Sequence, residues 1–112
     1  MSVLKVSVER NDDIKIIALD GQLDVSTSDL VREEVLSLFE DKPTIIFMEK
    51  CSYVSSSGLR SLLIMAKTAK AKGMKLVFAA PIAEVIDVFE MTGFIKMLKC
   101  VPTIEDAEKA LS

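Results

Sequence analysis

Apolar and polar residues alternate along residues 3–8, residues 14–19 form a second strand-like run, and the polar run Asn11-Asp12-Asp13 lies between them. Alternation at every second residue is typical of a strand that buries one face, and a short polar run is typical of a turn. The N-terminal part of the chain therefore predicts a β-hairpin. Asp20-Gly21 is expected to close it.

Four later segments space their apolar residues as amphipathic helices do. The first is predicted from Ser26, where several capping side chains gather, to the neighbourhood of Asp41. The second is predicted over residues 56–72, and Gly73 suits the left-handed position after its end. The third is expected to open at Pro81-Ile82 and to stop at Thr92-Gly93, and the fourth to start at Thr103, after Pro102.

Short apolar runs at residues 45–48, 75–80 and 96–101 separate these helices and are predicted to be strands. Strands that alternate with helices imply parallel pairing, whereas the opening hairpin adds an antiparallel pair. The sequence thus predicts an α/β fold. It is expected to form one domain over residues 1–112, with a mixed sheet of four to five strands and about four helices packed against it.

The composition of the chain argues against several classes of function. Half of the residues are hydrophobic, 28% are charged and the net charge is −3, which is the profile of a soluble globular protein without a nucleic-acid-binding face. Neither a signal peptide nor a membrane span is predicted. Cys51 and Cys100 are expected to be buried, reduced thiols of a cytoplasmic protein. Lys67, Lys70, Lys72 and Lys75 gather near one helix end, which favours a solvated face over a binding patch.

The best candidate for a functional site is the run Val54-Ser55-Ser56-Ser57-Gly58-Leu59, which stands where a strand-like segment gives way to a helix. The first turn of a helix has unpaired N–H groups and the positive end of the helix dipole. Such a place suits an anion, including a phosphate carried on one of the serines themselves.

Enzymatic interpretations of the serine run find little support. It lacks the first glycine of the G-x-S-x-G elbow, and the chain contains no histidine, so it has no Ser-His-Asp triad. Phosphate-binding loops and clusters of metal ligands are also missing from the sequence. We therefore expect neither a catalytic residue nor a metal or cofactor, and the chain is not predicted to be an enzyme.

Five short segments, in this order and at these spacings, resemble the STAS domain, in particular the small bacterial anti-sigma factor antagonists. No single segment is specific, but together they span essentially the whole chain. The segments are Gly21-Gln22-Leu23-Asp24, Ser56-Ser57-Gly58-Leu59, Lys72-Gly73-Met74-Lys75-Leu76, Val88-Phe89-Glu90-Met91-Thr92-Gly93-Phe94 and Thr103-Ile104-Glu105-Asp106-Ala107.

The resemblance implies a protein that binds an anti-sigma factor or serine protein kinase and so releases a sigma factor. Phosphorylation of a serine at the start of the second helix switches such proteins off, and a serine phosphatase resets them. By position that serine is Ser56. Asp24, Ser55, Ser57 and Gly58 fall at the implied partner surface. A monomer or weak dimer is expected, with no nucleic acid or membrane as partner.

Two positions depart from the family pattern. Ser55 stands where an aspartate commonly precedes the modified serine, and Phe47 replaces a second acid at the end of the third predicted strand. The alternatives are therefore a STAS domain that senses a nucleotide or lipid, and an interaction module whose serines only cap the helix. Asp24 likewise suits either partner contact or a turn that helps to cap the helix after it.

Overall fold

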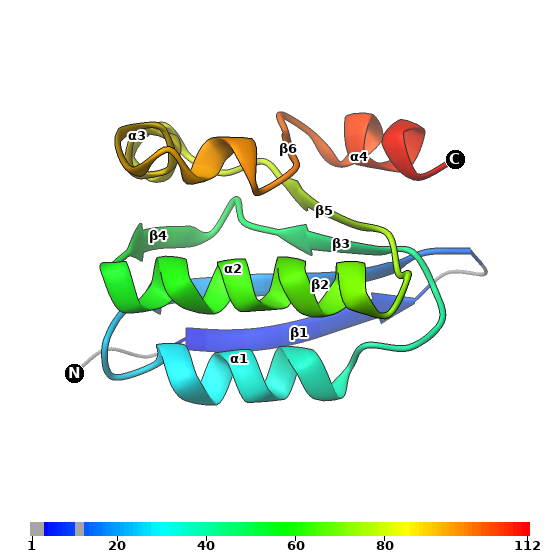
Figure 1. The fold of residues 1–112 in the computed structure, drawn as a ribbon, viewed down its shortest axis with the longest axis horizontal. Helices are drawn as coiled ribbons and strands as arrows, with labels where there is room; N and C mark the ends of the chain where they lie inside the picture. Colours follow the sequence, from blue (N-terminus) through cyan, green and yellow to red (C-terminus); the bar gives the residue numbers. More distant parts are fainter. Residues whose placement is uncertain (1–3, 11–12) are drawn as a thin grey trace.

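The computed structural model describes residues 4–10 and 13–112. These residues form a mixed β-sheet flanked by helices (Figure 1). The strands are β1 Leu4–Arg10, β2 Lys15–Leu23, β3 Thr44–Phe47, β4 Cys51–Val54, β5 Leu76–Ala79 and β6 Cys100–Val101. The helices are α1 Ser28–Ser37, α2 Ser56–Ala71, α3 Ala83–Thr92 and α4 Ile104–Leu111, with a short 3-10 helix η1 at Phe94–Lys96. None of the helices in this described part is long and apolar enough to cross a membrane.

The sheet has the order β1-β2-β3-β5-β6, with β4 also paired to β2. β1 runs antiparallel to β2, and the other pairs are parallel. The long strand β2 serves two partners: its first half pairs with β3, and residues 21–23 pair with β4. The predicted mixed sheet with four helices is confirmed, and the strand number exceeds the prediction because β3 and β4 follow one another along β2.

Neighbouring residues in the central strands point to opposite faces of the sheet, and both faces are apolar. One face packs against α1, α2 and α3 around a core that includes Ile17, Ile46, Leu62, Phe78 and Phe89. The other face packs against α4 through Ile45, Val77, Ala79, Ala107 and Leu111. Because full burial of one such large apolar side chain is worth about 1.5–3 kcal/mol, these two clusters hold the helices to the sheet.

Helix α1 ends at Ser37 rather than near Asp41, because a side chain from the sheet binds the chain just after it. Lys15 is fully buried, and its Nζ donates to the carbonyl oxygen of Leu38 and, at 2.6 Å, to Oε2 of Glu40. A cation at a helix C-terminus satisfies a free carbonyl and complements the dipole. The pattern of apolar and polar residues could not predict this contact, because Lys15 lies far from Glu40 in sequence.

Three other sequence expectations need correction. β2 does not end at Asp20-Gly21 but continues to Leu23. Its pairing with β4 shifts register between Gly21 and Gln22, and Gly21 has a φ of 136°. β4 was not predicted as a strand of its own. The strand expected over residues 96–101 shrinks to Cys100–Val101, because Phe94–Lys96 forms η1 instead. Of the predicted hairpin turn, Asn11 and Asp12 lie outside the described residues.

Candidate functional site at the start of α2

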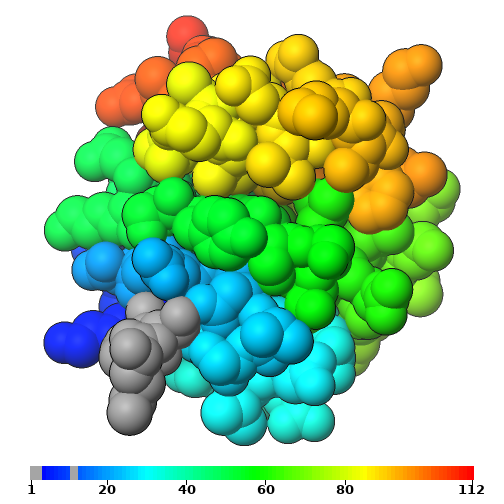
Figure 2. Space-filling model, turned by 90° about the vertical axis from the view of Figure 1, so that its left-hand side faces the viewer, coloured from blue at the N-terminus to red at the C-terminus, as the bar shows by residue number. Residues whose placement is uncertain are grey.

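The serine run lies at one end of the sheet, where two parallel strands finish side by side. Leu23 of β2 is in register with Val54 of β4, so Asp24 and Ser55 follow at neighbouring strand ends. The amide of Ser55 donates to the carbonyl oxygen of Leu23 at 2.9 Å. Figure 2 looks onto this end of the molecule: the green segment that starts α2 lies between the light-blue segment leading into α1 and the yellow helix α3.

Ser55 is the N-cap of α2. Its backbone is extended (φ −82°, ψ 176°), and its Oγ accepts a hydrogen bond from the Gly58 amide at 3.1 Å. This is the usual way in which a serine satisfies one of the unpaired N–H groups of a first helical turn. The first turn of α2 contains no acidic residue, so the positive end of the dipole there has no negative side chain of its own turn beside it.

Ser56 and Ser57 occupy the first two helical positions, Ser56 exposed and Ser57 half-buried. Within the described part of the chain, the Ser56 hydroxyl makes no hydrogen bond. The Ser55 hydroxyl, in contrast, accepts the hydrogen bond from the Gly58 amide that caps the helix. Of the three serines, Ser56 is therefore the most accessible to another protein.

Gly58 has a role that the sequence did not reveal. It is buried, and a β-carbon added to it would lie 2.4 Å from the carbonyl oxygen of Leu23 and 2.9 Å from Leu23 Cγ. Such a separation is far shorter than real contacts allow. Glycine at this position lets the start of α2 lie directly on β2. Gly58 is buried, so it contributes to the site by allowing this close packing and not by an exposed side chain.

Asp24 orders the loop between β2 and α1. Its Oδ1 accepts from the amide and the hydroxyl of Ser26, at 2.9 and 2.7 Å. Thr27 holds the N-cap position of α1, but its Oγ1 donates to the Gln22 carbonyl and accepts from the Asp24 amide instead of capping the helix. The turn interpretation of Asp24 thus matches the geometry, and its contact with a partner stays a prediction.

Sequence analysis missed a buried serine that fixes this end of α2 to α1. Ser61 is buried, and its Oγ donates to the Ser28 carbonyl at 3.1 Å. A hydroxyl on the apolar face of a predicted helix was the available signal, since buried hydroxyls normally find a partner.

Large apolar side chains are exposed next to the serines. Val25 follows Asp24 and is 80% exposed, and Tyr53 of β4, two residues before Ser55, is 51% exposed. Leu30, in the first turns of α1, is also exposed. Val25 and Tyr53 therefore add exposed apolar area next to the strand ends that carry Asp24 and Ser55.

The two cysteines do not join the site. Cys51 is buried in the main core and Cys100 lies on β6, and both are free thiols. Burial raises the pKa of the Cys51 thiol and raises that of Cys100 to about 11. Both are therefore protonated at neutral pH, as expected for structural thiols.

Comparisons with known proteins identify the family to which this fold belongs. The model of the STAS domain matches residues 5–107. BtrV of Bordetella bronchiseptica, named as a candidate anti-sigma factor antagonist, is 24% identical over 109 residues, which cover 96% of this chain and 94% of BtrV. The solved structure of an anti-sigma factor antagonist from Mycobacterium paratuberculosis superposes with a TM-score of 0.83 at 20% identity, covering 97% of this chain and 94% of that one.

The solved anti-sigma factor antagonist SpoIIAA, in its unphosphorylated form, gives a TM-score of 0.74 at 21% identity and covers 95% of both chains. At such identities the structures establish the fold alone. A small α/β domain of this fold is thus what the structure and its neighbours share. The chain belongs to the STAS domain family.

Proposed function

We propose that this protein is an anti-sigma factor antagonist, and that phosphorylation of Ser56 switches it off. The observation that carries the proposal is the exposed Ser56 hydroxyl in the first turn of α2, beside the Asp24 loop and free of the cap that engages Ser55. The names of its relatives support the class of partner.

A phosphate at Ser56 would be tolerated by the free protein. It adds about −1.5 to −2 charges at neutral pH, and the dipole at a helix N-terminus stabilises an anion by roughly 0.3–1 kcal/mol. Because the first turn of α2 holds no acid, the new charge meets no like charge from that turn. The fold is therefore expected to persist after modification.

The same phosphate would oppose binding. A charged group that loses its water in an interface costs several kcal/mol unless it gains a partner. Since about 1.4 kcal/mol corresponds to a tenfold change in affinity, even part of this cost strongly lowers the affinity of the modified protein for its partner. A local change of charge thus acts as a switch without a change of fold.

The docking surface comprises Asp24, Ser55 and Ser57, with Val25 and Tyr53 supplying exposed apolar area beside them. Gly58 belongs to this site as the residue that lets α2 approach the sheet. The partner is an anti-sigma factor or a serine protein kinase, and a serine phosphatase restores the unmodified form.

A second candidate is a STAS interaction module that is never phosphorylated. The observation that favours it is the neutral Ser55 at the place where the family commonly has an aspartate, since its hydroxyl already serves as the helix cap. This candidate predicts partner binding that is indifferent to ATP.

Incubation with ATP and each serine protein kinase of the source organism, followed by mass spectrometry, tests the proposal. We expect a gain of one phosphate that is lost in Ser56→Ala and retained in Ser55→Ala and Ser57→Ala. In a pull-down, the phosphorylated protein should retain less anti-sigma factor than the unmodified one. Absence of phosphate with every kinase, together with no anti-sigma factor in the pull-down, would refute the proposal, whereas binding without modification would favour the second candidate.

A further inference from the structure

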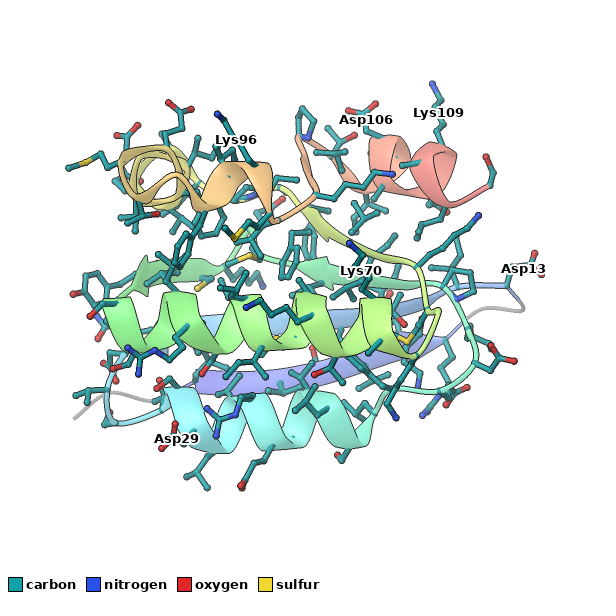
Figure 3. All side chains as sticks on the ribbon, viewed as in Figure 1. Asp13, Asp29, Lys70, Lys96, Asp106 and Lys109 are labelled. Atoms are coloured by element: carbon teal, nitrogen blue, oxygen red, sulfur yellow. The ribbon has the colours of Figure 1, made fainter. Side chains whose placement is uncertain are left out.

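A groove of about 350 Å³ lies between α2 and η1, away from the serine run. Four of its lining residues, Leu63, Ala66, Lys67 and Lys70, belong to α2, and Lys96 and Met97 belong to the segment at η1. The α2 residues follow at spacings of three and four, so they share one face of the helix. Figure 3 labels Lys70 and Lys96 on the two elements that bound the groove.

The groove is basic although the chain is acidic. Three lysines line it and no carboxylate does, against a net charge of −3 for the whole protein. Over the ranges 4–10 and 13–112, the ion pairs involve Arg10, Lys15 and Arg32, and none involves a groove lysine. Charges of one sign that line a concave surface concentrate their potential there and attract ligands of the opposite sign.

The floor of the groove is apolar. Leu63 and Ala66 are half-buried, and Met97 is 58% exposed. Methionine is common at surfaces that adapt to a bound helix. A small inorganic anion would neutralise the lysines but leave this apolar area in water, and a flat lipid surface would not fill a concave groove.

We infer that the groove binds an acidic amphipathic helix of a partner protein. Its apolar side would cover Leu63, Ala66 and Met97, and its carboxylates would face the lysines. An amphipathic helix laid in a groove is a common mode of recognition, anchored by residues at helical spacing. The inference does not rest on the proposed function, because Ser56 and Lys70 stand about 21 Å apart along α2 at 1.5 Å per residue.

The test is an NMR titration of the amide signals with a synthetic helical peptide that carries leucines on one side and glutamates on the other. Two control peptides are used: one has the same composition in an order that abolishes the apolar side, and the other has lysine in place of glutamate. We expect shifts confined to residues 63–70 and 94–97, and only with the first peptide. Added salt should weaken the binding, because the attraction of exposed charges is screened.

The variant Lys67→Glu/Lys70→Glu/Lys96→Glu should weaken this binding at least tenfold. Lys5→Glu/Lys50→Glu/Lys109→Glu is the matched control: it changes the net charge equally at exposed positions outside the groove, and should alter binding less than twofold. Dispersed amide signals in both variants show that the fold is intact. Ser56→Ala should bind the peptide as the unchanged protein does, which separates this inference from the phosphorylation switch.

Several results would overturn the inference: no shifts, equal binding of the reordered peptide, or equal weakening in the two triple variants. Tighter binding of vesicles containing phosphatidylserine, or of pyrophosphate, at the same lysines would overturn it as well. The occupant would then be a lipid surface or a small anion rather than a protein helix.

Discussion

The carbonyl oxygen of Leu23 lies so close to Gly58 that a β-carbon on Gly58 would approach it to 2.4 Å. The same oxygen accepts the amide of Ser55 at 2.9 Å. One backbone carbonyl of β2 therefore fixes both the cap and the first turn of α2. The start of this helix has no room to move toward the sheet.

Gly58→Ala should destabilise the protein although alanine favours helices more than glycine does. The helix gain is about 1 kcal/mol, but the clash is with backbone, and overpacking typically costs about 1–3 kcal/mol. Denaturant unfolding should show a net loss. Ser57→Ala, one position away and half-buried, is the control and should change stability by less than about 0.5 kcal/mol. A Gly58→Ala protein as stable as the original would show that α2 can shift.

Ser55→Asp should stabilise the free protein. Aspartate caps a helix about as well as serine, and its charge adds roughly 0.3–1 kcal/mol at the dipole, in a turn that has no acid of its own. Ser55→Ala removes the bond to the Gly58 amide and should cost about 0.5–2 kcal/mol. Thermal unfolding measures both changes, and the cap assignment is wrong if the alanine variant keeps its full stability.

Lys15→Met should lower stability by about 1 kcal/mol or more, because the bond to the Leu38 carbonyl is lost while the buried stem is roughly replaced. Relief of the desolvated charge offsets part of this cost. Lys72→Met, at an exposed position after α2, is the matched control and should be nearly neutral. Chemical unfolding of both variants gives the comparison, and equal effects would mean that Lys15 does not hold the end of α1.

Glu40 should make the stability of the protein depend on pH in the acidic range. The hydrogen bond from Lys15 is the main cause that lowers the pKa of its carboxyl below the ordinary value of 4.5. A group whose pKa is lower in the folded state stabilises the protein above its unfolded pKa. That contribution should be fully present above pH 4.5 and disappear as the pH falls through the lower, folded value.

Unfolding measured across this acidic range for the unchanged protein and for Glu40→Gln isolates the effect. The difference between the two should shrink as the pH falls. A constant difference would mean that the Lys15–Glu40 contact contributes nothing that depends on protonation. Solvent screens the exposed carboxylate, so the direction of the change is the quantity to compare.

Local patterns were sufficient to predict much of this fold. α2 was predicted over residues 56–72 and runs from Ser56 to Ala71, and Gly73 adopts the predicted left-handed conformation after it, with φ of 70°. Gly93, predicted to stop the third helix, follows α3 with φ of 79°. Helical periodicity and left-handed glycines are properties of a few neighbouring residues, so the sequence displays them directly.

The missed features depend on residues far apart in the chain. The end of α1 depends on Lys15, the separate strand β4 depends on the far half of β2, and Gly58 is explained only by Leu23. At the candidate site, the serine run was located by its place before a helix. The exposed Val25 and Tyr53 beside it came to light only in the folded structure.

The fixed start of α2 has a consequence for timing. Under the proposed function, a partner docked on Asp24, Ser55 and Ser57 would also cover the exposed hydroxyl of Ser56, because the Leu23 carbonyl fixes the start of α2. Occupancy and modification then exclude one another. A kinase that is not itself the bound partner has to wait for dissociation, so the lifetime of the complex sets how soon the switch responds.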